Sequence, residues 1–129
     1  MMITEAAKKM PGEISEIIVL DPTENCPASQ VGATQIIGDF KDKDAIIELA
    51  NKSDIITYEI ESGDSDVLKS VENNAEINPS PETLKIIQDK FLQKSFLDEN
   101  NIPVPEFMKI KNIEAVSYTH LTLPTILLV

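Results

Sequence analysis

The sequence predicts an α/β domain built around a parallel sheet, and two observations lead to that fold class. Short apolar runs alternate with amphipathic helical patterns, which is the order of elements in βαβ units. One of these runs, Ile17-Ile18-Val19-Leu20, is continuously apolar and mostly β-branched. Such a run is typical of a strand that is buried on both faces of a parallel sheet.

The first half of the chain contains most of the predicted sheet. Pro11-Gly12 ends the first helical pattern, Asp21-Pro22 ends the first strand, and either Asp42 or Asp44 can begin the second helix. The predicted segments are a helix over 1–10, a strand over 17–20, a loop over 23–34, a strand over 35–38, a helix from Asp42 or Asp44 to Ala50, and a strand over 55–58. The chain begins inside a helix, with no capping residue and no strand before it. We therefore expect a truncated sheet that lacks its first strand.

The second half is expected to lead away from this domain. A weaker helix covers 65–71, and Asn78-Pro79-Ser80-Pro81 interrupts the chain. Ser80 can cap a helix with Pro81 at its first position, and the apolar pattern predicts that this helix continues to about Asn100. An extended connector over 102–105 and a short strand over 107–110 follow. The tail 116–129 loses its acidic residues and becomes rich in threonine and leucine, so we expect it to be non-native.

Composition excludes several classes of function. The net charge is −11, and all eleven basic residues are lysines. Without a basic face, nucleic acid is not an expected partner. No run approaches the roughly 20 apolar residues that span a membrane. One cysteine, Cys26, permits no intrachain disulfide, which fits a cytoplasmic protein.

Four blocks of residues resemble 5-(carboxyamino)imidazole ribonucleotide synthase, a purine-biosynthesis carboxylase of the ATP-grasp class. They occur in the order found in that family, and together they are far more specific than any one of them. The blocks are VLDPTENCPASQVG at 19–32, Ile37-Gly38-Asp39-Phe40 with the helix after it, Asp54-Ile55-Ile56-Thr57-Tyr58-Glu59-Ile60-Glu61, and Gln88-Asp89-Lys90 with Gln93-Lys94, Phe96-Leu97 and Ile102-Pro103-Val104-Pro105.

The resemblance implies an activity and a domain plan. The family carboxylates aminoimidazole ribonucleotide with bicarbonate and ATP, uses Mg²⁺, and commonly forms homodimers. The implied plan is a Rossmann-like pre-ATP-grasp domain over 1–78, a linker helix and the start of an ATP-grasp domain over 79–115, and the tail over 116–129. The family's first strand and its G-x-G-Q-L-G loop have no counterpart here. The chain is thus expected to be an N-terminal fragment that is inactive by itself.

The resemblance also implies binding residues. Glu59 and Glu61 follow a strand and would hold the amine of the substrate, although Ser62-Gly63 replaces the family's His-Val after them. Ser29 and Gln30 would help to frame the same substrate. Lys90 replaces a family arginine that contacts ATP, and could act on phosphate as a point charge.

Other interpretations remain open at this stage. The acids at 59 and 61 and the lysine at 90 can equally be solvated surface groups. Asp21 fits a capping role with Pro22 better than a ribose contact, and Cys26 has no histidine partner outside the tail. The chain could instead be a stand-alone acidic module that binds a nucleotide or a protein. It could also be the first domain of another ATP-grasp enzyme, such as the formate-dependent purine ligase or a biotin carboxylase.

Overall fold

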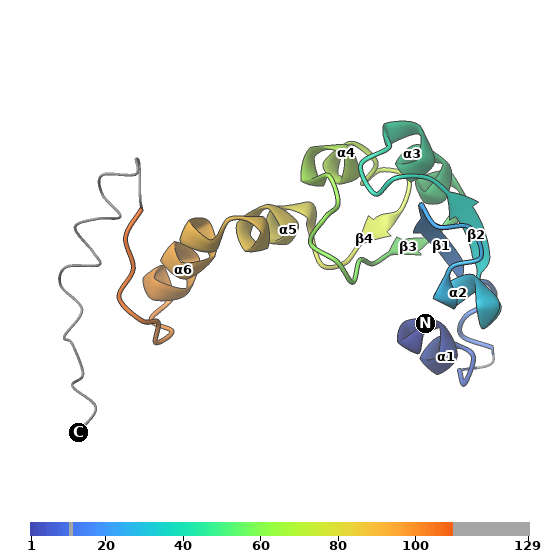
Figure 1. Cartoon of the computed structure of the whole chain (residues 1–129), viewed down its shortest axis with the longest axis horizontal. Coiled ribbons are helices and arrows are strands. Elements are labelled where there is room, and N and C mark those ends of the chain that lie inside the picture. Colours follow the sequence, from blue (N-terminus) through green and yellow to red (C-terminus); the bar gives the residue numbers. More distant parts are fainter. Residues whose placement is uncertain (11, 110–129) are drawn as a thin grey trace, which may run out of the picture. The chain divides into compact units, whose positions relative to one another are not determined.

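The computed structural model describes residues 1–10 and 12–109 of the 129-residue chain. These residues fall into two units, with the boundary between Gln88 and Asp89. Figure 1 labels the helices and strands. The first unit contains α1 (Met2–Ala7), β1 (Ile18–Asp21), α2 (Pro27–Gln30), β2 (Thr34–Ile37), α3 (Lys43–Lys52), β3 (Ile55–Ile56), α4 (Ser65–Ser70), β4 (Glu76–Ile77) and α5 (Pro81–Gln88). The described part of the second unit contains α6 (Lys90–Glu99).

The strands form two small parallel sheets. β1 pairs with β2 from Ile18↔Thr34 to Asp21↔Ile37, and β3 pairs with β4 through two residue pairs. Helices connect the strands, so the predicted α/β class with parallel pairing is confirmed. The expectation that the first strand is buried on both faces is wrong, since all four residues of β1 are only half-buried. The physical reason is that, among the described residues, β1 has a strand neighbour on one side alone.

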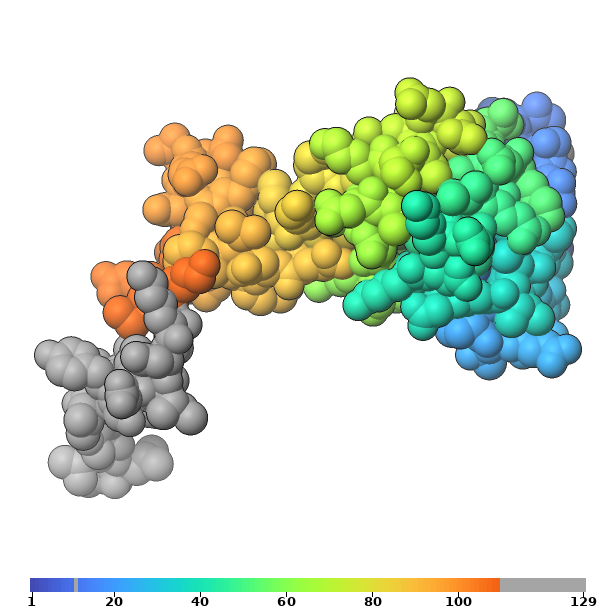
Figure 2. Space-filling model, turned by 90° about the horizontal axis from the view of Figure 1, so that it is seen from above, coloured from blue at the N-terminus to red at the C-terminus, as the bar shows by residue number. Residues whose placement is uncertain are grey.

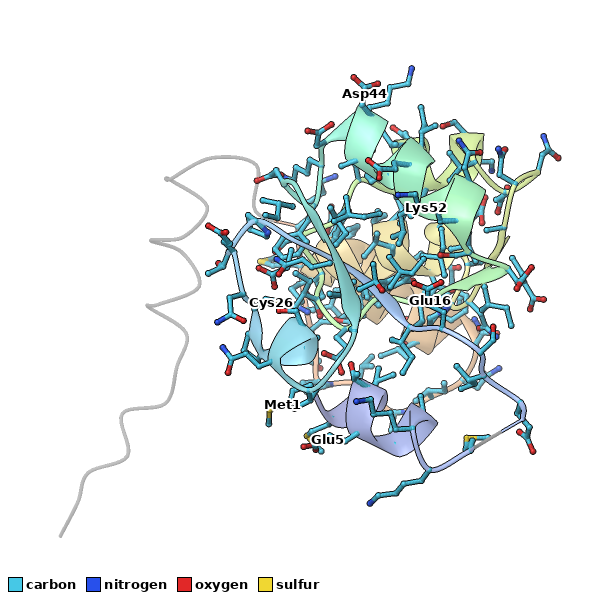
Figure 3. All side chains as sticks on the ribbon, turned by 90° about the vertical axis from the view of Figure 1, so that its right-hand side faces the viewer. Met1, Glu5, Glu16, Cys26, Asp44 and Lys52 are labelled. Carbon is cyan, nitrogen blue, oxygen red and sulfur yellow. The ribbon has the colours of Figure 1, made fainter. Side chains whose placement is uncertain are left out.

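Helices lie on both sides of the strands within the first unit. In Figure 1, α3 and α4 lie on one side and α1 and α2 on the other, and Figure 3 shows the same layers from the side. Figure 2 shows α3 and α4, in teal to green, covering the face seen from above. Helices on both faces of parallel strands are the arrangement of the α/β class.

Two groups of apolar side chains hold the unit together. The larger consists of Ile46, Ala50, Ile56, Leu68, Val71, Ala75 and Leu84. Leu84 of α5 is completely buried, so α5 packs as part of this unit. The smaller group consists of Cys26, Ala28 and Ala33, against which Ile17 and Val19 pack. Cys26 is therefore a buried core residue rather than an accessible thiol.

Aspartate side chains fix where three helices begin. Asp42 caps α3 by accepting hydrogen bonds from the N–H groups of Asp44 and Ala45, so of the two candidates it is Asp42 that caps the helix. Asp64 caps α4 in the same way. Asp89 caps α6, accepting from Phe91 N–H at 2.8 Å and Leu92 N–H at 3.2 Å. Each cap satisfies backbone donors that have no partner within the helix.

The structure departs from the predicted segments at several places. The single helix expected from Pro81 to Asn100 is two helices, because Asp89 leaves the helical conformation to cap α6. The predicted loop 23–34 contains the short helix α2, and β4 was not expected. The predicted strand 107–110 is wrong for residues 107–109, which have no regular structure. The tail 116–129 lies outside the described residues.

The second unit exposes much of its apolar surface. No residue of α6 is buried, Phe96 is 47% exposed, and Phe91 and Leu97 are half-buried. The apolar face of this segment is thus only partly covered within the described residues. Phe91 and Phe107 meet edge to face with ring centroids 5.7 Å apart. The ammonium group of Lys94 lies over the Phe107 ring, and that of Lys109 lies over the Phe91 ring.

Candidate functional site

An open depression of about 410 Å³ lies next to the segments that follow β2 and β3. Its lining residues are Lys41, Glu61, Ser62, Gly63, Asp64, Ser65 and Gln88. Lys41 comes from the connection after β2, residues 61–65 come from the connection after β3, and Gln88 is the last residue of α5. In open parallel sheets, ligands bind outside the carboxyl ends of the strands. This depression is therefore the candidate site.

The loop from Tyr58 to Gly63, whose residues 61–63 line the depression, contacts α5 at three places. At the start of α5, the Tyr58 hydroxyl donates to the Ser80 carbonyl at 3.1 Å. At the end of α5, the side-chain amide Nε2 of Gln88 donates to the carbonyls of Glu61 and Gly63, both at 2.7 Å. Between them, a Cβ placed on Gly63 would stand 3.4 Å from a methyl group of Leu84. The conformation of this loop thus depends on α5.

Tyr58 is the titratable group of this loop with a shifted pKa. Burial raises the pKa of its phenol above the ordinary value, and this outweighs a backbone hydrogen bond with Leu84 that lowers it. A raised pKa favours the neutral phenol, which is the form that can donate to the Ser80 carbonyl. The contact between loop and helix therefore persists to a higher pH than that of a tyrosine with the ordinary pKa of 10.0.

The depression offers both charge signs and several hydrogen-bonding groups. Lys41 supplies a cation, and Glu61 and Asp64 supply carboxylates. The Asp64 carboxylate already accepts from the N–H groups of Asp66 and Val67, both at 3.0 Å, so its main role is to cap α4. Ser62 and Ser65 add hydroxyl groups. This set suits a small polar molecule that carries an amine or hydroxyl groups for Glu61 and an anionic group for Lys41.

The structure brings one of the five predicted binding residues into the depression. Glu61 lines it, whereas Glu59 is exposed two residues earlier and is not among the lining residues. Lys90 belongs to the second unit, where its ammonium donates to the Gln93 side chain at 3.3 Å. The binding roles of all three stay predictions.

Ser29 and Gln30, the other two predicted residues, make bonds within their own segment. The Ser29 hydroxyl donates to the Cys26 carbonyl, and the Gln30 amide donates to the Asn25 carbonyl, each at 2.8 Å. Neither residue lines the depression. In this conformation their side chains stabilise the turn around α2, and their substrate contacts stay a prediction.

Gln35 of β2 organises the loop that follows β1. Its Nε2 donates to the carbonyls of Asp21 and Thr23 at 3.3 and 2.7 Å, and its Oε1 accepts from Cys26 N–H at 3.3 Å. The Asp21 carboxylate accepts from Thr23 N–H at 2.8 Å, so it bonds locally to the backbone just after Pro22.

Sequence reasoning overlooked Lys41 and Gln88 as lining residues. Lys41 stands four residues after the end of β2, so its position beyond a strand terminus was an available signal. Gln88 carried no such signal, because its role depends on how α5 packs against a distant loop.

Over residues 1–10 and 12–109, no cluster of histidine, cysteine and acidic side chains could hold a metal ion. Nor does any helix of those residues have the length and apolar character to cross a membrane.

Comparison with known proteins decides the family. The model of the ribonucleotide synthetase preATP-grasp domain matches residues 1–88, which is the extent of the first unit. This chain belongs to that family. The predicted relationship and the predicted pre-ATP-grasp fold are therefore confirmed.

Named relatives of this preATP-grasp chain are enzymes of purine biosynthesis. Phosphoribosylaminoimidazole carboxylase of Vigna aconitifolia is 38% identical over 121 residues, which are 93% of this chain and 21% of that protein. The crystal structure of N5-carboxyaminoimidazole ribonucleotide synthetase from Thermotoga maritima is 46% identical, with a TM-score of 0.81 over 92% of this chain and 32% of that one.

A further structure shows ligands bound to such a relative. N5-carboxyaminoimidazole synthase from Aspergillus clavatus, in complex with ADP and 5-aminoimidazole ribonucleotide, is 36% identical with a TM-score of 0.72 over 81% of this chain and 27% of that one. Our chain thus spans about a fifth to a third of the length of these proteins.

Proposed function

We propose that this preATP-grasp chain is the N-terminal part of a ligase that carboxylates aminoimidazole ribonucleotide with ATP and bicarbonate in purine biosynthesis. The observation that carries the proposal is the family match over the whole first unit, together with relatives that bear this activity in their names. The depression supports it, because its mixed charges suit a substrate with an amine, ribose hydroxyls and a phosphate.

Each predicted residue has a role in this proposal. The Glu61 carboxylate accepts hydrogen bonds from the substrate amine, and Glu59 contributes negative charge beside it. Ser29 and Gln30 frame the ribonucleotide, after exchanging their present backbone partners for it. Lys90 contacts the phosphates of ATP as a point charge. Mg²⁺ would be bound with ATP, outside the described residues.

The chain alone is proposed to be inactive. Phosphoryl transfer requires groups that position ATP and stabilise the developing charge. In ATP-grasp enzymes those groups belong to the domain after the preATP-grasp domain, and the family match ends at residue 88. The intact enzyme is proposed to be cytoplasmic and homodimeric.

The test compares the chain with an enzyme that carries it together with a first strand, glycine-rich loop and ATP-grasp domain. We expect ADP formation that requires both aminoimidazole ribonucleotide and bicarbonate in the longer protein, and none in the 129-residue chain. Stimulated turnover by the chain alone, free of contaminating enzyme, would refute its proposed inactivity. Turnover of the longer protein with glycinamide ribonucleotide and formate instead would assign it to the formate-dependent ligase.

A further inference from the structure

The carboxylate-bearing loop of the candidate site has no secondary structure of its own. Residues 57–64, between β3 and α4, contain neither helix nor strand. A loop of this kind places a side chain reproducibly only if something outside it fixes its backbone. Of the contacts described above, the two from Gln88 are the shortest, and both end on backbone carbonyls within the depression wall.

We propose that Gln88 is a positioning residue, whose side-chain amide holds the backbone from Glu61 to Gly63 in the conformation that receives the ribonucleotide. The inference rests on the proposed function, because it assigns the loop a substrate. Gln88 itself needs no contact with the reacting atoms. It acts through the loop, by fixing where the Glu61 side chain leaves the backbone.

The chemistry of the contact requires a primary amide of this length. The Gln88 Nε2 atom carries two N–H groups, and the two carbonyls at 2.7 Å match them one to one. A glutamate in its place has the same shape but would point a charged oxygen at two carbonyl oxygens. A methionine keeps the length and removes both donors. An asparagine keeps the donors but is one methylene too short to reach.

The contacts of Ser80 and Leu84 with this loop do not hold the carbonyls of Glu61 and Gly63. The Tyr58 hydroxyl bonds to Ser80 at the opposite end of the helix, and Leu84 meets Gly63 through apolar contact that fixes no direction for a carbonyl. Losing the Gln88 amide should therefore loosen residues 61–63 while the core around Leu84 stays packed. That pattern separates a positioning residue from one that merely stabilises the fold.

The first experiment measures loop order in the chain by ¹⁵N NMR relaxation. In the unmodified chain we expect the amides of residues 61–63 to have order parameters near those of rigid backbone, about 0.85, and in Gln88→Glu and Gln88→Met to fall below about 0.6. Asn74→Asp is the matched control. Asn74 donates an exposed side-chain amide bond to Asn51 at 2.7 Å, and neither residue lines the depression. Unchanged order at residues 61–63 in both Gln88 variants would overturn the proposal.

The second experiment measures kinetics in the longer enzyme described above. We expect Gln88→Glu, Gln88→Met and Gln88→Asn to raise the KM for aminoimidazole ribonucleotide by roughly 3- to 10-fold, the size of about one net hydrogen bond, with kcat within about twofold and Asn74→Asp unchanged. A purely structural role would reduce the folded fraction, and so kcat, without changing KM. A loosened loop with unchanged KM would overturn the positioning role. If the unmodified longer enzyme does not use this ribonucleotide, the proposed function fails, and the positioning role fails with it. The order parameters would still report whether the Gln88 amide holds the loop.

Discussion

Replacing Leu84 by alanine should cost the first unit a large part of its stability. Leu84 is completely buried and belongs to the main apolar cluster, so the change removes three carbons from a filled core. At about 0.8 kcal/mol for each buried CH₂, the transfer cost is about 2.4 kcal/mol. The cavity left behind adds to this, and a total of about 3–4 kcal/mol lies within the measured range for such changes. Small domains have only about 5–15 kcal/mol of stability.

The assay is urea denaturation followed by far-ultraviolet circular dichroism, with Ile14→Ala as the matched control. Ile14 lies in the same unit and is 40% exposed, so losing the same number of carbons there should cost less than about 1 kcal/mol. For a unit of this size, the Leu84→Ala loss corresponds to a fall in Tm of roughly 12–30 °C. Equal losses in the two variants would refute the conclusion that α5 is part of the core.

Three further predictions concern the cap, the tyrosine and the sheet edges. Asp89→Ala should destabilise α6 by about 0.5–2 kcal/mol and speed amide exchange at Phe91 and Leu92, whereas unchanged exchange would mean that the cap is dispensable. Because the Tyr58 pKa is raised in the folded state, the stability that Tyr58 contributes should be present below its ordinary pKa of 10.0 and lost as the pH rises through the higher folded pKa. Tyr58→Phe should remove this loss of stability at alkaline pH in thermal melts. A variant with the same pH profile as the unmodified chain would contradict this prediction. The short sheets leave strand edges open among the described residues, so light scattering should detect concentration-dependent association that Ile55→Lys, at a residue 63% exposed on β3, reduces; a monomer at all concentrations would argue against it.

Local patterns predicted the elements that have strong periodicity or clear punctuation. The apolar run at 17–20 and the stripe of α3 placed a strand and a helix close to where they occur. The same reasoning joined α5 and α6, because the apolar spacing of Leu84, Ile87 and Phe91 continues across Asp89. An aspartate inside a helical pattern can be a surface residue or a cap. Only the backbone conformation, with its two accepted hydrogen bonds, distinguishes them.

The candidate site was predictable in one respect and not in another. That acids after a strand lie near a binding depression follows from the position of strand ends in parallel sheets, and Glu61 does line the depression. The partnership of Gln88 with Glu61 and Gly63 spans about 25 residues of sequence. It depends on packing α5 against the loop, and no periodicity within either segment encodes it. The same holds for Gln35, whose partners belong to another strand and its loop.

The Gln35 side chain gives the pairing of β1 with β2 a means of rejecting misaligned alternatives. The ladder has four residue pairs, and a shift by one residue would turn every side chain of β2 to the opposite face. An exposed isoleucine such as Ile37 discriminates weakly between the two faces. A misaligned Gln35, however, would lose its bonds to the Asp21 carbonyl at the end of β1 and to the Thr23 carbonyl and Cys26 N–H group of the following loop. The hydrogen bonds of a single side chain therefore couple the alignment of β1 with β2 to the conformation of the loop between them.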